Sequence, residues 1–212
     1  MPAAPNDEHV FEVVSSVVRF SGPVITVVSD EVVMPDGGTA VRDYIVHVGA
    51  VGAVALDFSD DPAGRVLLVR QYRHPVRRGL WELPAGLLDV AGEPAVETAK
   101  RELWEEADLV AGRWEVLVDL LTTPGCSDEA IRIFLARDIS AAPEHDRHTR
   151  IGEEQIMTTE WVPLDTAVEW AFAGEIENAA CTAGVLAAAR ARDTGFANLR
   201  PVDAPWPARP GR

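Results

Sequence analysis

Residues 98–109, TAKRELWEEADL, place three carboxylates within five positions of one predicted helix. Apolar residues recur at three- and four-residue spacing along the same stretch, at Val96, Ala99, Leu103 and Ala107. One face of this helix should therefore pack against a core. Glu102, Glu105 and Glu106 then share another sector, where like charges at these spacings cost roughly a few tenths of a kcal/mol per pair. A bound cation would convert that repulsion into attraction.

Two interpretations of the acidic sector are open. Hard divalent cations such as Mg²⁺ and Mn²⁺ bind oxygen ligands, and carboxylates at i, i+3 and i+4 can meet one cation from one rigid surface. The alternative is a solvated acidic face, with Glu97 and Arg101 as an ordinary i,i+4 pair. Spacing alone favours the solvated face, because runs of charge on helices are common.

The composition of the chain excludes several classes of protein. Its 212 residues hold 34 acidic and 19 basic side chains, a net charge of −15, which disfavours a nucleic-acid partner. Two cysteines, Cys126 and Cys181, make neither a disulfide framework nor a zinc pattern. The N-terminal MPAAPNDEHV does not resemble a signal peptide, and no apolar run reaches about 18 residues. We expect a cytoplasmic protein with no membrane partner.

Valine-rich runs typical of strands dominate the first sixty residues, and strands and helices interleave afterwards. The predicted strands cover residues 11–20, 24–34, 39–48, 53–58, 65–71, 114–121, 130–139 and 156–164. The predicted helices cover residues 93–107, 164–173 and 178–192. This order predicts an α/β fold in which helices cover a mixed sheet, with a small N-terminal β subdomain.

The context of the acidic helix changes the balance between its two interpretations. Glu93 stands at the start of the helix, eight residues before Arg101, and Gly86 lies in the preceding loop. Glu93-x7-Arg101-Glu-Leu-Trp-Glu-Glu resembles the Nudix box, Gly-x5-Glu-x7-Arg-Glu-U-x-Glu-Glu-x-Gly-U, where U is aliphatic. The sequence departs from this pattern in two places. Six residues instead of five separate Gly86 from Glu93, and Asp108 stands where the pattern has a glycine. Aspartate tolerates the left-handed backbone that a helix C-terminus needs, so the helix can still end there.

Three features outside the box resemble the ADP-ribose pyrophosphatase branch of the Nudix hydrolases. They are RQYRHPVRRGLWELPAG at 70–86, TTPGCSDEAIRIFLA with Pro124 fifteen residues beyond Leu109, and GEIENAACTAGVLAAA near the C-terminus. The resemblance implies hydrolysis of ADP-ribose, or of ADP-sugars, to AMP and ribose 5-phosphate. Another nucleotide substrate, such as a nucleoside triphosphate or a different nucleotide sugar, is the enzymatic alternative. A non-catalytic nucleotide sensor is the alternative from another class.

The resemblance covers most of residues 10–200 and implies the Nudix fold, a mixed β-sheet sandwiched between helices. We expect a flexible tail at residues 1–9 and a β subdomain at 10–47. The Nudix hydrolase domain is expected at 48–200, and a Pro-rich flexible tail at 201–212. Because ADP-sugar members are commonly homodimers in which N-terminal strands reach the partner, the resemblance also implies a homodimer formed through residues 10–47.

The resemblance assigns the metal ligands. It implies that Glu102, Glu105 and Glu106 hold Mg²⁺, with Mn²⁺ as a possible substitute, and that the backbone carbonyl of Ala85 completes the set. Glu105 is expected to take part in catalysis as well.

The substrate-binding and proton-accepting residues come from other segments. Residues 65–80 carry five arginines and no acid, which suits a diphosphate, and Arg73 is favoured because it directly follows a strand. Arg73, Glu82 and Glu129 are the expected substrate contacts. The polar loop PEHDRHTRIGEEQI at 143–156 supplies the candidate general bases, Glu154 first and Glu153 second. The alternative interpretation is that Glu153 and Glu154 are simply solvated acidic residues of the loop.

Overall fold

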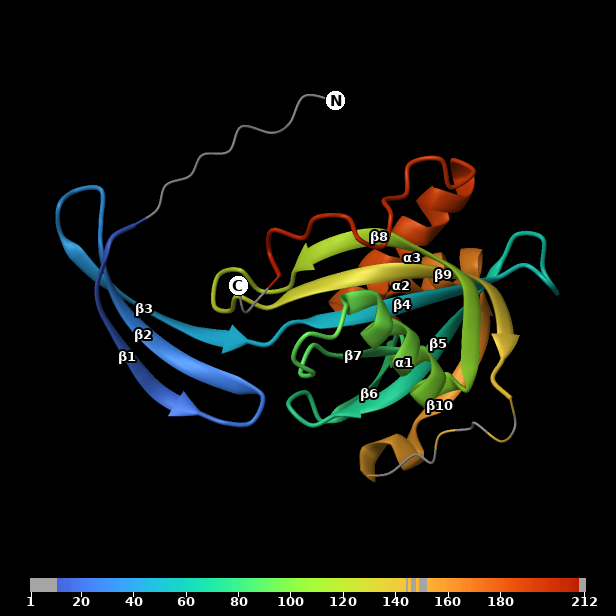
Figure 1. The fold of residues 1–212 in the computed structure, drawn as a ribbon, viewed down its shortest axis with the longest axis horizontal. Coiled ribbons are helices and arrows are strands. Elements are labelled where there is room, and N and C mark those ends of the chain that lie inside the picture. The colour runs from blue at the N-terminus through green and yellow to red at the C-terminus, as the bar shows by residue number, and fades with distance from the viewer. Residues whose placement is uncertain (1–10, 144, 146–147, 149–151, 210–212) are drawn as a thin grey trace. The chain divides into compact units, whose positions relative to one another are not determined.

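The computed structural model describes residues 11–143, 145, 148 and 152–209, and the side chains of Glu153 and Glu154 lie outside this description. The chain forms two compact units, which are considered separately (Figure 1). One unit contains the chain up to His47 together with Thr123–Glu129. The other contains Val48–Thr122 and the chain from Ala130 onward.

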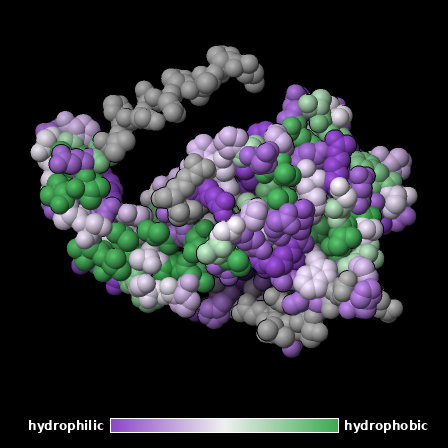
Figure 2. Space-filling model, viewed as in Figure 1, coloured by the Kyte–Doolittle hydropathy of each residue, from purple (hydrophilic) through white to green (hydrophobic). Residues whose placement is uncertain are grey.

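The first unit is a three-stranded antiparallel sheet in the order β1-β2-β3, formed by Val13–Ser21, Ile25–Val33 and Thr39–His47. The strands predicted here are confirmed. The segment Thr123–Glu129 joins β3 through hydrogen bonds from the Ile45 amide to the Cys126 carbonyl, 2.8 Å, and from the Asp128 amide to the Ile45 carbonyl, 3.1 Å. Every residue of β1 is exposed, and hydrophobic side chains gather along these strands (Figure 2).

The second unit is built on a seven-stranded mixed sheet. Five strands run in the order β10-β5-β4-β9-β8, β6 pairs with β5, and β7 pairs with β4. The strands are β4 Ala50–Asp57, β5 Arg65–Arg73, β6 Arg78–Glu82, β7 Ala85–Leu87, β8 Leu109–Leu121, β9 Ala130–Ala141 and β10 Thr158–Pro163. The β4–β9 pair is parallel and the other pairs are antiparallel. The short strands β6 and β7 were not expected from the sequence.

Helices cover both faces of this sheet, as predicted (Figure 1). They are α1 Ala95–Ala107, α2 Leu164–Ala173 and α3 Ala179–Asp193, with the 3-10 helix η2 at Gly152–Ile156. Alternate residues of β4 pack on opposite sides, since Val54 and Leu56 contact the cluster under α2 and α3, whereas Val51 and Ala55 contact clusters under α1. None of the described helices is long and apolar enough to cross a membrane.

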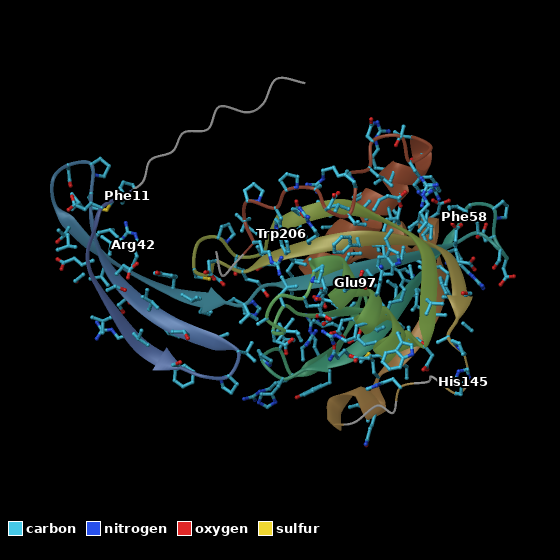
Figure 3. The ribbon with its side chains drawn as sticks, viewed as in Figure 1. Phe11, Arg42, Phe58, Glu97, His145 and Trp206 are labelled. Atoms are coloured by element: carbon cyan, nitrogen blue, oxygen red, sulfur yellow. The ribbon has the colours of Figure 1, made fainter. Side chains whose placement is uncertain are left out.

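The last described residues differ from the flexible tail expected at 201–212. Trp206 is 4% exposed and lies against the guanidinium of Arg132 on β9, with 4.9 Å from the Arg132 Cζ to its ring centroid (Figure 3). Arg132 also donates hydrogen bonds to the carbonyls of Ala204, 2.7 Å, and Pro205, 3.0 Å. A buried guanidinium needs such acceptors, so residues 201–209 are held against the sheet. Residues 210–212 lie outside the described chain.

Candidate active site

The helix α1 buries the face that its spacing predicted. Ala99 and Leu103 are fully buried, and Val96 and Ala107 pack at the edges of the same clusters. The helix ends at Asp108, which adopts a left-handed conformation with φ 54° and ψ 36°. Its amide donates to carbonyls of the last turn, so aspartate fulfils the capping function usual for glycine.

Glu106 lies at the junction between α1 and the sheet. Its side chain is buried, and Oε2 accepts a hydrogen bond from the amide of Ala85, 3.1 Å. In an extended strand the N–H and C=O of one residue point to the same edge. Ala85 therefore directs its carbonyl toward the α1 side as well, whereas Pro84 accepts a bond from Ala53 on β4, 2.8 Å. The structure thus brings together two of the four predicted metal ligands.

Glu102 lies against the backbone of Gly86. A Cβ placed on Gly86 would overlap the carboxylate of Glu102, so a larger residue there would have to displace that carboxylate from the strand. The glycine therefore permits the close approach of Glu102 to β7, and no unusual backbone angle is involved. The extra residue between Gly86 and Glu93 does not disturb this contact.

Arg101 bridges the acidic residues of the helix and its preceding turn. Its Nη1 lies 2.7 Å from Glu102 Oε1 and 3.2 Å from Glu105 Oε2, and its Nη2 lies 3.3 Å from Glu93 Oε2. Burial alone would lower the pKa of Arg101, but the hydrogen bond to Glu93 and the nearby carboxylates outweigh it and raise that pKa. Hydrogen bonds from Thr98 and Arg101 lower the pKa of Glu93. Both shifts favour the charged form of the group concerned.

The donor set suits a hard divalent cation, but it is not preformed. Among the described residues, no three His, Cys, Asp or Glu side chains are grouped as a metal centre. Glu102 and Glu105 instead converge on one cationic nitrogen of Arg101, which supplies the neutralising charge in this structure. The available donors are carboxylate and carbonyl oxygens, the ligand type that Mg²⁺ and Mn²⁺ prefer. By chemistry the residues fit such an ion.

The predicted substrate residues Arg73 and Glu82 contact each other. Arg73 donates to both carboxylate oxygens of Glu82, at 2.9 and 2.7 Å, from the end of β5 to the buried end of β6. The five arginines of residues 65–80 do not converge on one point. Arg65 pairs with Asp57 at the opposite end of β5, and Arg78 pairs with Glu177.

The remaining predicted residues lie elsewhere. Glu129 belongs to the first unit, where its Oε1 is 3.7 Å from His47 Nε2. The backbone of Glu153 and Glu154 forms part of η2, but their side chains lie outside the described structure. The eight-residue spacing between Glu93 and Arg101 had placed Arg101 within reach of the loop before the helix, and the two residues do contact each other. The contacts of Arg101 with Glu102 and Glu105 were not expected, although the i,i+4 spacing of Arg101 and Glu105 was a visible signal.

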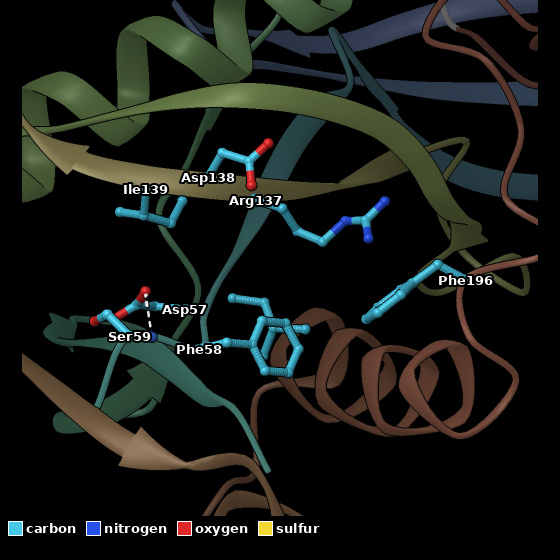
Figure 4. A pocket seen from close by; sticks show the side chains of 8 residues that line it. Asp57, Phe58, Ser59, Arg137, Asp138, Ile139 and Phe196 are labelled. Carbon is cyan, nitrogen blue, oxygen red and sulfur yellow. Dashed lines mark hydrogen bonds between the residues drawn. The ribbon is translucent and has the colours of Figure 1, made fainter. Parts of the chain in front are cut away.

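A separate hollow of about 500 Å³ contains none of the predicted site residues (Figure 4). It is lined by Leu56, Asp57, Phe58, Ser59, Arg137, Asp138, Ile139 and Phe196. It lies at the Asp57 end of β4, whereas β7 pairs with Ala50–Gly52 at the other end. The chemistry of the box therefore does not lie in this hollow, and the carboxylates of α1 remain the candidate site.

Comparison with known proteins agrees with this geometry. The sequence model of the NUDIX domain family matches residues 46–182 of this chain. The chain is 47% identical over 203 residues to an ADP-ribose pyrophosphatase of Mycobacterium tuberculosis (strain ATCC 25618 / H37Rv), covering 96% of this chain and 94% of that protein. It is 32% identical over 160 residues to an ADP-ribose pyrophosphatase of Bacillus subtilis (strain 168), covering 76% and 82%.

A solved structure described as an ADP compounds hydrolase shares the fold. It aligns with a TM-score of 0.72 at 19% identity, covering 88% of this chain and 96% of that one. The matched box, the α1 carboxylates beside β7, and the mixed sheet between helices agree with one another. This chain belongs to the Nudix family.

Proposed function

We propose that this enzyme hydrolyses the pyrophosphate bond of ADP-ribose, consuming one water and giving AMP and ribose 5-phosphate. The observation that carries the proposal is the gathering of box carboxylates against β7, with Glu106 bonded to Ala85 and Glu102 packed on Gly86. The two relatives named as ADP-ribose pyrophosphatases support the choice of substrate.

Nudix hydrolases act with divalent cations, and Mg²⁺ is the ion proposed here, with Mn²⁺ as a substitute. Such an ion neutralises phosphate charge and makes a water nucleophilic at neutral pH. Ala85, Glu102, Glu105 and Glu106 are the residues proposed to hold it. Arg101 keeps Glu102 and Glu105 on one side of the helix, and its second amino group remains anchored on Glu93.

Proton transfer needs a carboxylate that is not committed to the cation. Glu105 is proposed to assist as a ligand close to the reacting water. Glu154, carried by η2, is proposed as the general base, with Glu153 as the second candidate. Their segment follows β9 and precedes β10, and a polar segment between two strands can close over bound substrate.

Arg73, Glu82 and Glu129 are proposed to contact the substrate. The bidentate bond to Glu82 fixes the plane of the Arg73 guanidinium, which limits the rotamer entropy lost when a phosphate is bound. Turnover of another nucleotide remains the alternative activity. A non-catalytic sensor is disfavoured, because such proteins usually lose box glutamates and this chain retains them.

Residues 10–47 are proposed as a dimerisation subdomain that precedes a Nudix domain at 48–200. Five apolar side chains of β1 are exposed, namely Val13, Val14, Val17, Val18 and Phe20. In the described residues β1 pairs only with β2, which leaves its other edge open. Exposed apolar edge strands favour pairing with a further strand, so a second copy of this chain is the proposed partner. A cytoplasmic location is also proposed, supported by two free thiols.

Turnover of ADP-ribose, ADP-glucose, NADH and dATP with Mg²⁺ tests the proposed activity. We expect ADP-ribose to give the highest kcat/KM, with equimolar AMP and ribose 5-phosphate by chromatography. Glu106→Gln tests the site itself. The amide oxygen of the glutamine can still accept the Ala85 hydrogen bond, but the negative charge of Glu106 is lost. Turnover by this variant should fall by about 10²-fold or more. A higher kcat/KM for dATP would show that ADP-ribose is not the preferred substrate. Wild-type turnover by Glu106→Gln would show that Glu106 is not part of the active site.

The general base is tested by comparing Glu154→Gln with Glu153→Gln. Losing a positioned proton acceptor lowers kcat by about 10²-fold or more, and we expect this for Glu154→Gln only. The KM for ADP-ribose and the affinity for Mg²⁺ should change little, because neither depends on the proton acceptor. Equal effects of the two substitutions, or a larger effect of Glu153→Gln, would contradict the assignment. If neither substitution lowers kcat, the general base is another group.

The dimer is tested with the double substitution Val14→Lys and Val18→Lys. Lysines on an edge strand oppose pairing with another strand, so light scattering should report a monomer where the unmodified protein is a dimer. Val110→Lys, which places the same charge on an exposed valine of β8, is the control and should leave the mass unchanged. A dimer that survives the double substitution would place the interface elsewhere.

A further inference from the structure

The C-terminal segment runs from β8 to the turn that precedes α1. Arg200 pairs with Val116 through backbone hydrogen bonds of 2.9 and 3.4 Å. Nine residues later, Arg209 Nη2 donates to the carbonyl oxygen of Glu93, 3.2 Å. A segment outside the Nudix box therefore contacts the first glutamate of the box directly.

A buried arginine anchors the middle of this segment. Arg132 is 3% exposed and holds Asp119 through two hydrogen bonds of 2.7 and 2.9 Å. Two further donors of Arg132 go to the carbonyls of Ala204 and Pro205. Arg200 also contacts Asp119, 2.7 Å. Removing the segment would leave donors of a buried charge unsatisfied, which is strongly unfavourable.

Trp206 and three prolines keep the segment in place. The buried indole of Trp206 contributes a large apolar area and a cation–π contact with Arg132. Pro201, Pro205 and Pro207 restrict the unfolded segment, so less conformational entropy is lost when it is ordered. These contacts hold Arg209 next to the box without any contribution from its side chain.

Glu93 is fixed from three directions. Its amide donates to the carbonyl of Val90, 3.2 Å, and its carbonyl accepts from Arg209. Its carboxylate accepts from Thr98, 2.8 Å, and from Arg101, 3.3 Å. Because Arg101 is also the residue that bridges Glu102 and Glu105, a continuous series of polar contacts leads from Arg209 to the acidic face of α1.

The contact with Arg209 is not explained by the electrostatics of the helix. The N-terminus of a helix carries a partial positive charge, so a cation beside it is opposed by the macrodipole. The hydrogen bond instead fixes the position of the Glu93 carbonyl, one residue before the Pro94 cap. This hydrogen bond therefore acts by fixing the position of Glu93, the residue whose carboxylate holds Arg101.

We propose that Arg209 is a positioning residue for the cation site. The segment 200–209, called here the C-terminal strap, holds the turn at Glu93 so that Arg101 keeps Glu102 and Glu105 aligned toward one ion. This inference rests on the proposed metal-dependent function of α1. It assigns a role to residues that lie outside the box.

The test is Mn²⁺ binding to the full-length protein by isothermal titration calorimetry, without nucleotide. Arg209→Ala should raise the Mn²⁺ dissociation constant by about five- to tenfold, the scale of the net contribution of one ordinary hydrogen bond. Arg209→Lys keeps a cationic donor and should recover part of the loss. Turnover of ADP-ribose by Arg209→Ala should fall at low Mn²⁺ and return toward the wild-type kcat at saturation, with KM for ADP-ribose unchanged.

Arg192→Ala is the matched control. Arg192 also donates from its guanidinium to a backbone carbonyl, that of Ala63, 3.0 Å, and its ion pairs are with Asp165 and Asp193, which lie outside α1. It should leave the Mn²⁺ dissociation constant unchanged whatever it does to the melting temperature. Wild-type Mn²⁺ affinity in Arg209→Ala, or equal weakening in both variants, would overturn the positioning role. If wild-type protein binds Mn²⁺ but does not hydrolyse ADP-ribose, weaker binding by Arg209→Ala would still support the strap, and only the proposed substrate would fail.

Discussion

The site depends on the pairing of Arg101 with the acidic residues around it. Three glutamates within five positions of one helix repel one another, and the cost of that repulsion rises as they leave water. Arg101 offsets this repulsion by contacting Glu102, Glu105 and Glu93 at once. The folded chain can therefore keep a concentrated negative charge at the edge of its core. The same charge makes the helix a receptor for a divalent cation.

The sheet contributes by bringing backbone atoms to this charge. The strand β7 is three residues long, and its pairing with β4 directs Ala85 toward α1. Gly86 lacks a side chain, which allows Glu102 to approach the strand closely. On the opposite face, Gly184 gives α3 similar access, because a Cβ there would lie 2.7 Å from Leu83 Cδ1. Helices on both sides thus fix β4, and β4 fixes the strand that completes the site.

Sequence reasoning predicted the parts of this arrangement that depend on local spacing. The apolar face of α1, its end at Asp108, the main strands and the family all follow from patterns within a few tens of residues. The short strands β6 and β7 carry too few residues for a clear alternation. The pairing of Arg132 with Ala204 joins residues 72 positions apart, so no local pattern could distinguish the strap from a loose Pro-rich tail. The pairing of Arg73 with Glu82 was likewise invisible, because a charged residue predicts exposure until a partner is known.

The central claim is that the carboxylates of α1 and the carbonyl of Ala85 share one divalent cation. Anomalous diffraction at the manganese edge, from crystals grown with Mn²⁺, tests it most directly. The account predicts a peak about 2.0–2.3 Å from oxygens of Glu102, Glu105 or Glu106, on the side of α1 that faces Ala85. A well-occupied peak bound by other residues, away from these carboxylates and from Ala85, would contradict it.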